Sequence, residues 1–339
     1  MTNSINKSCK MNLILKYIKR KLLMYWILRV CVISIFLVIG IVAYFILFPS
    51  IIYINSIDIP SFLVKTSAGE YELLNISTCP IVEINEEISL INVQKTVSST
   101  QLDFIKQSVS SGGEWMPKHC IPQHHTAIIV CYRNRTEQLL TFLYHMHSFL
   151  QKQNIHYQIY VIEQTFDAEF NRGKLFNVGY REVTMRSLAG CFIFHDVDLM
   201  PENINNIYGC TSCPRHMSTS INVFNYKLPY YNIFGGAIAM TRRQFHDING
   251  FSNVFYGWGG EDDDLFNRVY HRGYRVCRYP SFISRYTMLT HEKETPNENR
   301  MKYLRNGPKR FYTDGVDSVT YNLIKYEQLP LYTRILVNI

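Results

Sequence analysis

The feature that most constrains this chain is an uncharged apolar run of 19 residues near the N-terminus, from Val30 to Phe48. At 1.5 Å per helical residue the run spans roughly 28 Å, close to the thickness of a bilayer's hydrocarbon layer. A signal peptide has a shorter apolar region and a small-residue cleavage site, whereas this run ends in Leu-Phe-Pro-Ser. The alternative is a buried core helix. We expect one membrane-spanning helix, with the rest of the chain folding outside the bilayer.

The formal charge of +8 is concentrated ahead of this run. Asp58 is the first acidic residue of the chain, and seven basic residues precede the run: Lys7, Lys10, Lys16, Lys19, Arg20, Lys21 and Arg29. The remainder is therefore close to neutral, which argues against a nucleic-acid partner, because such proteins carry their basic patch on the folded domain. A basic flank on the N-terminal side alone places the N-terminus in the cytosol and the rest in a lumen.

Cysteine usage agrees with a lumenal compartment, where disulfides persist. Seven cysteines follow the run, an odd number, so at least one is free or pairs elsewhere: Cys79, Cys120, Cys131, Cys191, Cys210, Cys213 and Cys277. Asn75-Ile-Ser77 is a glycosylation sequon in a plausible surface segment. Asn134-Arg-Thr136 also matches, but we expect ligand contacts there.

Apolar strand candidates alternate with helical patterns in the first half of the folded region. Strands are expected at 126–131, 157–162 and 191–194, and helices after Thr136 and over 170–183. This alternation predicts a parallel α/β sheet, in which ligands bind at the carboxyl ends of the strands.

The second half is less regular. We expect a strand at 234–240, a short helix capped by Thr241, and a helix over 262–272 that stops at Gly273. The polar stretch 288–307 is typical of a lid loop.

Two aspartates follow the third predicted strand, in the sequence Asp196-Val197-Asp198. In an extended segment both carboxylates lie on one side, an arrangement that suits a divalent ion carrying a diphosphate. Arg133, Arg135 and Arg172 would be the phosphate partners in this interpretation. The alternative is a turn with solvated aspartates.

A row of four acids, Glu261 to Asp264, follows a tryptophan set among three glycines in Gly257-Trp258-Gly-Gly260. Glycines allow a sharp turn and close approach to a ligand, tryptophan offers a flat face for a sugar or nucleotide, and carboxylates accept protons. The segment predicts a site that binds a polyhydroxyl substrate. The alternative is a charged helix N-terminus, where acidic residues are favoured.

Taken together, these segments resemble the animal beta-1,4-galactosyltransferase family. The matching segments run in order from about residue 79 to the C-terminus: Arg133-Asn-Arg135, Phe170-Asn-Arg172-Gly-Lys-Leu-Phe-Asn-Val-Gly179, His195-Asp-Val-Asp-Leu-Met-Pro201, Phe234-Gly-Gly236, Gly257-Trp-Gly-Gly-Glu-Asp-Asp-Asp264, Met288-Leu-Thr-His291 and Thr313-Asp-Gly-Val-Asp-Ser-Val-Thr-Tyr321. The resemblance implies a nucleotide-sugar glycosyltransferase fold of the GT-A type, Rossmann-like with a mixed, mostly parallel sheet. The expected organisation is a cytosolic tail (1–29), a signal-anchor helix (30–48), a stem (49–78) and a lumenal catalytic domain (79–339).

The resemblance also implies a cofactor and donor contacts. Mn²⁺ would be held by Asp198, Met288 and His291, although spacing alone would not select that methionine and histidine. The nucleotide sugar would contact Arg133, Arg135, Phe170, Arg172, Asp196, Val197, Ile233 and Gly236. Family members carry Pro-Phe where this chain has Cys131-Tyr132, which changes the expected uracil contact. Disulfides Cys79–Cys120 and Cys191–Cys210 are implied as well.

On the acceptor side, the resemblance implies that Trp258 closes over the donor and that Glu261, Asp262 and Asp263 hold a terminal N-acetylglucosamine (GlcNAc). Asp262 would take the proton of the 4-hydroxyl, with Glu261 and Trp258 beside it in the catalytic centre. The remaining acceptor contacts would be Gly260, Arg300, Met301 and Leu304.

One departure from the family bears on the donor sugar. Galactose-specific members have Tyr immediately before Phe-Gly-Gly, and this chain has Ile233. Isoleucine removes a hydroxyl and leaves room for an N-acetyl group, so the resemblance implies a UDP-GalNAc donor, as in the invertebrate N-acetylgalactosaminyltransferase branch. The expected protein is a single-pass type II Golgi enzyme that modifies a glycoprotein or glycolipid. The alternatives are a galactosyltransferase using UDP-Gal, an inactive membrane-anchored glycan-binding protein, and a metal-dependent hydrolase.

Overall fold

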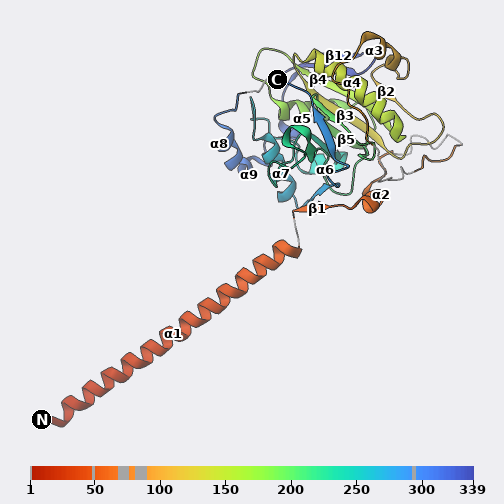
Figure 1. Cartoon of the computed structure of the whole chain (residues 1–339). Helices are drawn as coiled ribbons and strands as arrows, with labels where there is room; N and C mark the ends of the chain where they lie inside the picture. Colours follow the sequence, from red (N-terminus) through yellow and green to blue (C-terminus); the bar gives the residue numbers. More distant parts are fainter. Residues whose placement is uncertain (1, 48–49, 68–75, 81–89, 292–294) are drawn as a thin grey trace. The chain divides into compact units, whose positions relative to one another are not determined.

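The computed structural model describes residues 2–47, 50–67, 76–80, 90–291 and 295–339 (Figure 1). The chain divides into two units, Met1–Ser50 and Ile51–Ile339. The predicted glycosylation site at Asn75 lies outside the described residues.

The first unit is a single helix, α1 (Thr2–Leu47). Within it, the 22 residues Lys19–Gly40 are long and apolar enough to cross a membrane. This stretch begins earlier than the predicted span of 30–48, because residues 22–28 are also apolar and Arg29 is the one charge between them and that span. The side chains beyond Gly40 in this helix lie outside the described residues.

The second unit is built on a mixed, mostly parallel sheet. Within the described residues ten strands pair in the order β1-β10-β7-β9-β5-β3-β4-β13-β12, with β2 beside β4. The strands are β1 (Ile51–Tyr53), β2 (Glu114–Trp115), β3 (His125–Tyr132), β4 (His156–Gln164), β5 (Cys191–Asp196), β7 (Arg215–His216), β9 (Ala237–Thr241), β10 (Val276–Arg278), β12 (Asn322–Gln328) and β13 (Thr333–Asn338). The three strands predicted in the first half are confirmed as β3, β4 and β5, and they pair in parallel.

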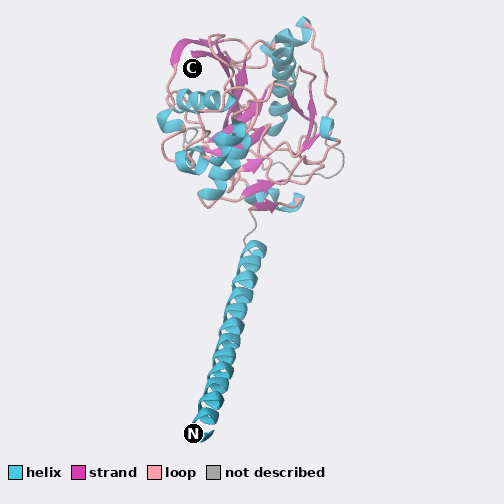
Figure 2. Ribbon diagram, turned by 90° about the vertical axis from the view of Figure 1, so that its left-hand side faces the viewer, coloured by secondary structure: helices cyan, strands magenta, loops and turns pink. Residues whose placement is uncertain are grey.

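Alternation along β3 explains how the sheet is covered on both faces. Ile128 and Val130 belong to one apolar cluster, with Phe142 of α4 (Thr136–Leu150). Ile129 belongs to the other, with Phe176 of α5 (Arg172–Thr184). Successive side chains of a strand point to opposite faces, so a fully buried strand needs apolar residues throughout, as His125–Tyr132 largely provides. Figure 2 shows helices on both sides of the strands.

Smaller elements complete this unit. The helices are α2 (Ile59–Phe62), α3 (Ser99–Lys106), α6 (Arg242–Asp247), α7 (Glu261–His271), α8 (Arg300–Arg305) and α9 (Gly307–Arg310), with 3-10 turns η1 (Ser56–Asp58), η2 (Gln151–Gln153), η3 (Asn222–Phe224) and η4 (Val316–Ser318). A second sheet pairs β6 (Leu199–Pro201), β11 (Arg285–Met288) and β8 (Ser220–Ile221). In this second sheet Met288 pairs with Leu199, so it lies next to Asp198.

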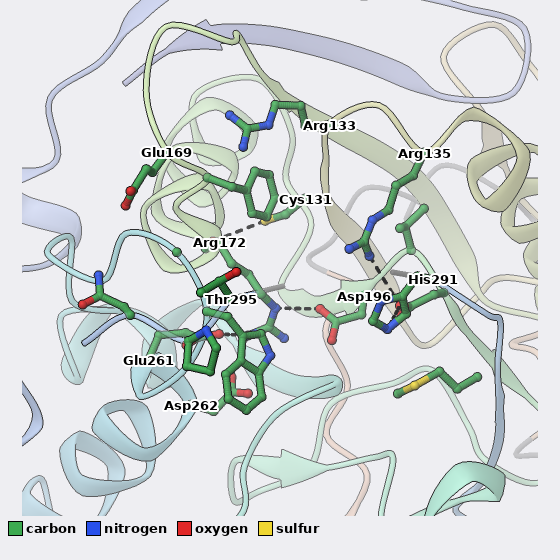
Figure 3. A pocket seen from close by; sticks show the side chains of 18 of the residues that line it. Cys131, Arg133, Arg135, Glu169, Arg172, Asp196, Glu261, Asp262, His291 and Thr295 are labelled. Carbon is green, nitrogen blue, oxygen red and sulfur yellow. Dashed lines mark hydrogen bonds and ion pairs between the residues drawn. The ribbon is translucent and has the colours of Figure 1, made fainter. Parts of the chain in front are cut away.

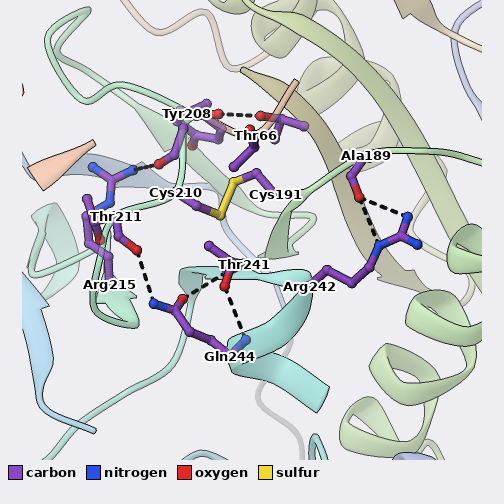
Figure 4. The surroundings of a disulfide bond; sticks show 12 residues. Thr66, Ala189, Cys191, Tyr208, Cys210, Thr211, Arg215, Thr241, Arg242 and Gln244 are labelled. Atoms are coloured by element: carbon purple, nitrogen blue, oxygen red, sulfur yellow. Dashed lines mark hydrogen bonds between the residues drawn. A yellow bond between two sulfur atoms is a disulfide. The ribbon is translucent and has the colours of Figure 1, made fainter. Parts of the chain in front are cut away.

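Three disulfides lie in the described part of the chain. Cys79–Cys120 and Cys191–Cys210 are the pairs that the resemblance implies, and the second joins the start of β5 to the segment before β7 (Figure 4). The third joins Cys213 to Cys277 of β10, two residues for which the sequence offered no partner. Cys131 is the free thiol among the described residues of this unit, and it is buried.

The predicted stem differs most from the structure. Ile51–Tyr53 pairs in parallel with β10, and Leu63 bridges to Thr211, so the chain joins the folded unit at residue 51. The physical reason is burial, because Ile51, Ile54 and Ile59 all insert into the apolar interior. Their irregular spacing carries no helical or strand periodicity, which is why the segment read as a stem.

Two local expectations also change, and a third is confirmed. The stretch 288–307, predicted as a loop, contains helix α8 and the start of α9. Thr136 is the first residue of α4 rather than its cap, a position held by Arg135. Thr241 does cap α6, in a reciprocal capping box with Gln244.

Candidate active site

A cleft of about 640 Å³ opens where β3 and β5 end and α5 and α7 begin (Figure 3). Twelve residues predicted for the site line it: Arg133, Arg135, Phe170, Arg172, Asp196, Val197, Asp198, Trp258, Glu261, Asp262, Met288 and His291. The carboxyl ends of the parallel strands therefore meet the acidic row in one cavity, as the topology of such sheets favours.

Arg172 lies at the centre of this cleft and joins its two acidic sides. Its Nε donates to Asp196 Oδ1 at 2.6 Å, and its Nη1 donates to Asp262 Oδ1 at 2.6 Å and to Glu261 Oε1 at 3.4 Å (Figure 3). Its position at the first turn of α5 is fixed by Asn171, whose side chain caps the helix at the Lys174 amide. The guanidinium predicted as a nucleotide contact is thus engaged by three carboxylates from both sides of the cleft.

The acidic row lies at the N-terminus of α7, so the structural alternative weighed for it is also true. All four acids fall in the first turn, where the helix dipole favours negative charge. Gly259 and Gly260 precede the helix with φ of 99° and 95°, a left-handed conformation that glycine adopts without strain. A Cβ at Gly235 would overlap the Asp262 carboxylate, so glycine there permits the close approach.

The four acids divide between cleft and scaffold. Glu261 and Asp262 line the cavity. Asp263 accepts a hydrogen bond from Tyr230 Oη at 2.9 Å outside it, and Asp264 pairs with Arg268 Nε at 2.7 Å in the interior. Two of the four carboxylates are therefore available to a substrate in the cavity.

Burial gives Asp262 an unusual proton affinity. Desolvation raises the pKa of its carboxyl to about 8, against the opposing pull of Arg172 and with the support of Glu261 and Asp196. A carboxylate with a pKa in this range is a much stronger base than an exposed aspartate. The arrangement suits a group that must accept a proton near neutral pH.

A second cluster lies across the cleft, around Asp198. His291 Nε2 lies 3.3 Å and Arg135 Nη1 3.5 Å from Asp198 Oδ2. Burial, and then the neighbouring Asp196, raise the pKa of Asp198 to about 6. The amide of Leu289 donates to the Asp198 carbonyl at 2.7 Å, which holds the segment that carries Met288 against the one that carries Asp198. The amide of Met288 donates to Asn222 Oδ1 at 2.8 Å.

The donor set of this cluster fits a divalent cation of intermediate softness. A carboxylate and an imidazole converge within 3.3 Å, and a thioether lies in the same cavity. Across the described residues no three His, Cys, Asp or Glu side chains form a metal cluster, so the third protein ligand here would be Met288. A cation would also relieve the repulsion between the two aspartates.

The nucleotide side of the cleft is built by Arg133 and Phe170. The guanidinium of Arg133 lies 5.3 Å from the Phe170 ring centroid and donates to the carbonyl of Ala168 at 2.7 Å. Cys131 lines the cavity, and its Sγ donates to the Arg172 carbonyl at 3.3 Å. Tyr132 does not line it, and its hydroxyl pairs with Thr136 at 3.2 Å.

Several predicted contacts lie outside this cavity: Ile233, Gly236, Gly260, Asp263, Arg300, Met301 and Leu304. Gly236 supports the site from behind, because its carbonyl accepts from the amide of Asp196 at 2.9 Å. Arg300 lies 5.5 Å from the Trp258 ring centroid. Sequence reasoning missed Glu169 and the segment Thr295–Asn299, which line the cavity without a recognisable pattern.

Trp258 connects the acidic row to that segment. Its side chain is 55% exposed, it bridges to Pro296, and its carbonyl accepts from the Asn297 amide at 3.1 Å. The neighbouring Gly257 amide donates to the Phe170 carbonyl at 2.8 Å. One exposed aromatic loop thus contacts both the nucleotide side and the segment that follows His291.

An α/β sheet with Asp196 and Asp198 where β5 ends, faced by a half-buried carboxylate and an exposed tryptophan, is the arrangement of a nucleotide-sugar glycosyltransferase of the GT-A type. Comparison with known proteins specifies the family. A profile of the N-terminal region of glycosyl transferase group 7 matches residues 79–211, and one of the N-terminal domain of galactosyltransferase matches 215–292. The chain belongs to the beta-1,4-galactosyltransferase family.

Individual relatives agree. Mouse beta-1,4-galactosyltransferase 1 is 39% identical over 291 residues, which are 83% of this chain and 71% of the relative. Human beta-1,4-galactosyltransferase 6 is 40% identical over 295 residues, which are 84% of this chain and 76% of the relative.

Among solved structures, the catalytic domain of Drosophila beta-1,4-galactosyltransferase 7 with xylobiose superposes with a TM-score of 0.55 at 30% identity, covering 63% of this chain and 93% of that one. A variant of that enzyme was solved with manganese, UDP-Gal and xylobiose, and it matches with a TM-score of 0.54 at 29% identity.

Proposed function

We propose that this protein is a Mn²⁺-dependent, inverting glycosyltransferase that moves GalNAc from UDP-GalNAc to the 4-hydroxyl of a terminal β-linked GlcNAc. The observation that carries the proposal is the pair of 2.6 Å contacts by which Arg172 joins Asp196 to Asp262. They bring a strand end suited to a metal and diphosphate next to a carboxylate suited to proton transfer. Transfer of a sugar from a nucleotide to a hydroxyl needs both.

Asp198, His291 and Met288 would hold the metal. The ion supplies charge neutralisation on the departing diphosphate when bound. Support comes from the convergence of these side chains and from the manganese in the solved relative. Arg135 lies beside Asp198 and would add a fixed positive charge for the same phosphates.

Asp262 would accept the acceptor's proton. Its carboxylate lines the cavity, and one of its oxygens, Oδ1, is oriented by Arg172. A carboxylate that removes the proton as the hydroxyl attacks C1 lowers the barrier by general base catalysis. Attack opposite the diphosphate inverts the anomeric centre, from an α-linked donor to a β-linked product.

The choice of GalNAc rests on Ile233. This residue is half-buried and immediately precedes Phe234-Gly235-Gly236, and Gly235 packs against the Asp262 carboxylate. An isoleucine offers the donor's C2 substituent an apolar surface and no hydroxyl. The second candidate is transfer of galactose from UDP-Gal, and the names of the relatives and the UDP-Gal in the solved relative favour it.

The proposed setting is a Golgi membrane, with α1 as the anchor and the folded unit in the lumen. Disulfides and an apolar helix preceded by basic residues support it. An inactive glycan-binding protein would have no need of Asp198, His291 and Asp262 together. A hydrolase would activate water, whereas the family's cleft admits a sugar hydroxyl.

The test is transfer of radiolabelled sugar from UDP-GalNAc and from UDP-Gal onto a GlcNAc glycoside, with Mn²⁺ and with EDTA. We expect Mn²⁺-dependent transfer, and a higher kcat/KM with UDP-GalNAc. Preference for UDP-Gal would replace the first candidate by the second. Absence of transfer from both donors, by folded protein, would leave the glycan-binding alternative.

A further inference from the structure

A fully buried arginine holds the segment that leads into the cleft. Arg278, the last residue of β10, has 0% of its surface exposed. Its Nη2 donates to the backbone carbonyls of Tyr231 at 2.9 Å and Ile233 at 2.8 Å. One guanidinium nitrogen therefore fixes the backbone on both sides of Asn232. One of the two carbonyls it holds is that of Ile233, the residue on which the proposed donor choice rests.

This arginine is not part of an ion pair. Its hydrogen bonds within the described residues go to two backbone carbonyls and to Tyr53 Oη, which accepts from Nη1 at 3.3 Å, and to no carboxylate. Its Nε is buried without a partner there. A buried guanidinium is costly unless hydrogen bonds compensate its lost hydration. Most of the compensation here comes from two carbonyls of a single loop, so the arginine and the loop backbone stabilise each other.

The held segment, residues 230–236, reaches both halves of the site. Tyr230 donates to Asp263, Gly235 packs against the Asp262 carboxylate, and the Gly236 carbonyl accepts from the Asp196 amide. A shift of this backbone would move the side chain at 233 relative to the two carboxylates.

The strand that carries Arg278 is itself firmly held. Cys277 forms a disulfide with Cys213, and β10 lies between β1 and β7 in the sheet. The guanidinium thus projects from a cross-linked strand toward a loop with a weak backbone bond of its own, from the Ile233 amide to the Tyr230 carbonyl at 3.4 Å. Rigidity in the strand is transmitted to the loop through Nη2.

We propose that Arg278 is a positioning residue that sets the donor-sugar preference by fixing the backbone of Ile233. The inference rests on the proposed role of Ile233 at the donor's C2 substituent. It does not depend on which of the two sugars the wild type prefers. Arg278 does not line the cavity and would act through the loop.

The chain offers a matched control in Arg215 of β7. This arginine is also 0% exposed and also donates to backbone carbonyls, those of Ile207 and Gly209. Those carbonyls belong to the segment between β6 and β7 and not to residues 230–236. Arg278→Lys and Arg215→Lys remove the same guanidinium from the same sheet, and only the first releases the donor segment.

The experiment measures kcat/KM for UDP-GalNAc and UDP-Gal, and their dissociation constants by calorimetry with Mn²⁺, in the full-length protein. Arg278→Lys should move the ratio of the two donors toward one by about tenfold, in the range of a single pocket contact, while the Mn²⁺ activation constant stays within about twofold. Arg215→Lys should lower Tm but keep the wild-type ratio. Equal losses of Tm with unchanged ratios in both variants would reduce Arg278 to a structural role and overturn the proposal.

Three further variants keep the test decisive. Ile233→Tyr alone and in the Arg278→Lys background should give non-additive changes in the ratio, because both act through one backbone. Additive changes would contradict the coupling.

If Arg278→Lys does not fold, Tyr53→Phe decides, since it removes only the hydroxyl that accepts from Nη1 and so loosens the guanidinium without replacing it. A ratio shifted at least twofold supports the inference, and an unchanged ratio rejects it. A wild type that does not discriminate between the donors rejects it as well, whereas preference for UDP-Gal rejects only the GalNAc assignment.

Discussion

Two acidic clusters line the cleft: the strand cluster, Asp196 and Asp198, and the helix cluster, Glu261 and Asp262. Both consist of carboxylates, but the groups that neutralise them differ. Asp196 and Asp198 end a strand, and Asp198 meets His291 and Arg135 at 3.3 and 3.5 Å. Glu261 and Asp262 begin a helix, and Arg172 pairs with both, as well as with Asp196 across the cleft. The first cluster has the donor set of a metal site, and the second already has its countercharge. The comparison teaches that carboxylate identity does not assign a role, whereas the partner of each carboxylate does.

The largest effect should follow from removing a metal ligand. Asp198→Asn or His291→Ala should lower kcat/KM on the order of 10³-fold or more, because charge on the leaving diphosphate loses its counter-ion. A Mn²⁺ titration of activity should shift to much higher metal concentration. Full activity of either variant in EDTA-treated buffer would remove the distinction between the clusters.

Asp262→Asn should act on the other cluster and on a different constant. We expect kcat to fall on the order of 10²- to 10³-fold, because a base acts in the transition state, while donor binding and Mn²⁺ dependence change little. Calorimetry with UDP-sugar and Mn²⁺ supplies the control. Weakened donor binding at unchanged kcat would mean that the helix cluster serves the nucleotide instead.

A smaller effect is expected on the donor preference, which rests on Ile233, two residues before the Gly235 that packs against Asp262. Ile233→Tyr should crowd an N-acetyl group and offer a hydroxyl to galactose, changing the UDP-GalNAc to UDP-Gal ratio of kcat/KM by about 10- to 200-fold. Ile233→Val, which keeps an apolar β-branched side chain, is the matched control and should retain the preference. A wild type and a tyrosine variant with the same preference would show that this side chain has no part in the choice.

Much of this comparison could be predicted from local sequence. Apolar strands that end in Asp196 and in Cys131-Tyr132 predicted that the strand cluster lies at the carboxyl ends of parallel strands. This was possible because strand periodicity is a local property and the rule for parallel sheets is general. Glycines before Glu261 likewise predicted the turn into the helix. The convergence of Met288 and His291 on Asp198 came only from the family resemblance, because no spacing rule relates such distant segments.

Other parts of the structure could not be read in advance, for physical reasons. Ile51, Ile54 and Ile59 are buried without periodicity, so their strand and turn looked like a stem. The Cys213–Cys277 pair and the carbonyl contacts of Arg278 depend on how β10 lies in the sheet. An arginine that binds backbone atoms leaves no complementary residue in the sequence to reveal its partner.

The pH dependence of kcat/KM also distinguishes the helix cluster from the strand cluster. Asp262 is basic only when ionised, and burial raises its pKa to about 8. Below that pH the ionised fraction falls as protons are added, so kcat/KM for the acceptor should rise about tenfold per pH unit up to roughly pH 8 and then level off. The measurement is a pH profile for wild type and Asp262→Asn, and the rising limb should be absent from the variant.

Because protons compete with metal at ligand carboxylates, a limb due to the strand cluster would move to lower pH as Mn²⁺ is increased. A limb due to Asp262 should stay in place when Mn²⁺ is raised tenfold, and a limb that moved would assign the titration to the strand cluster instead.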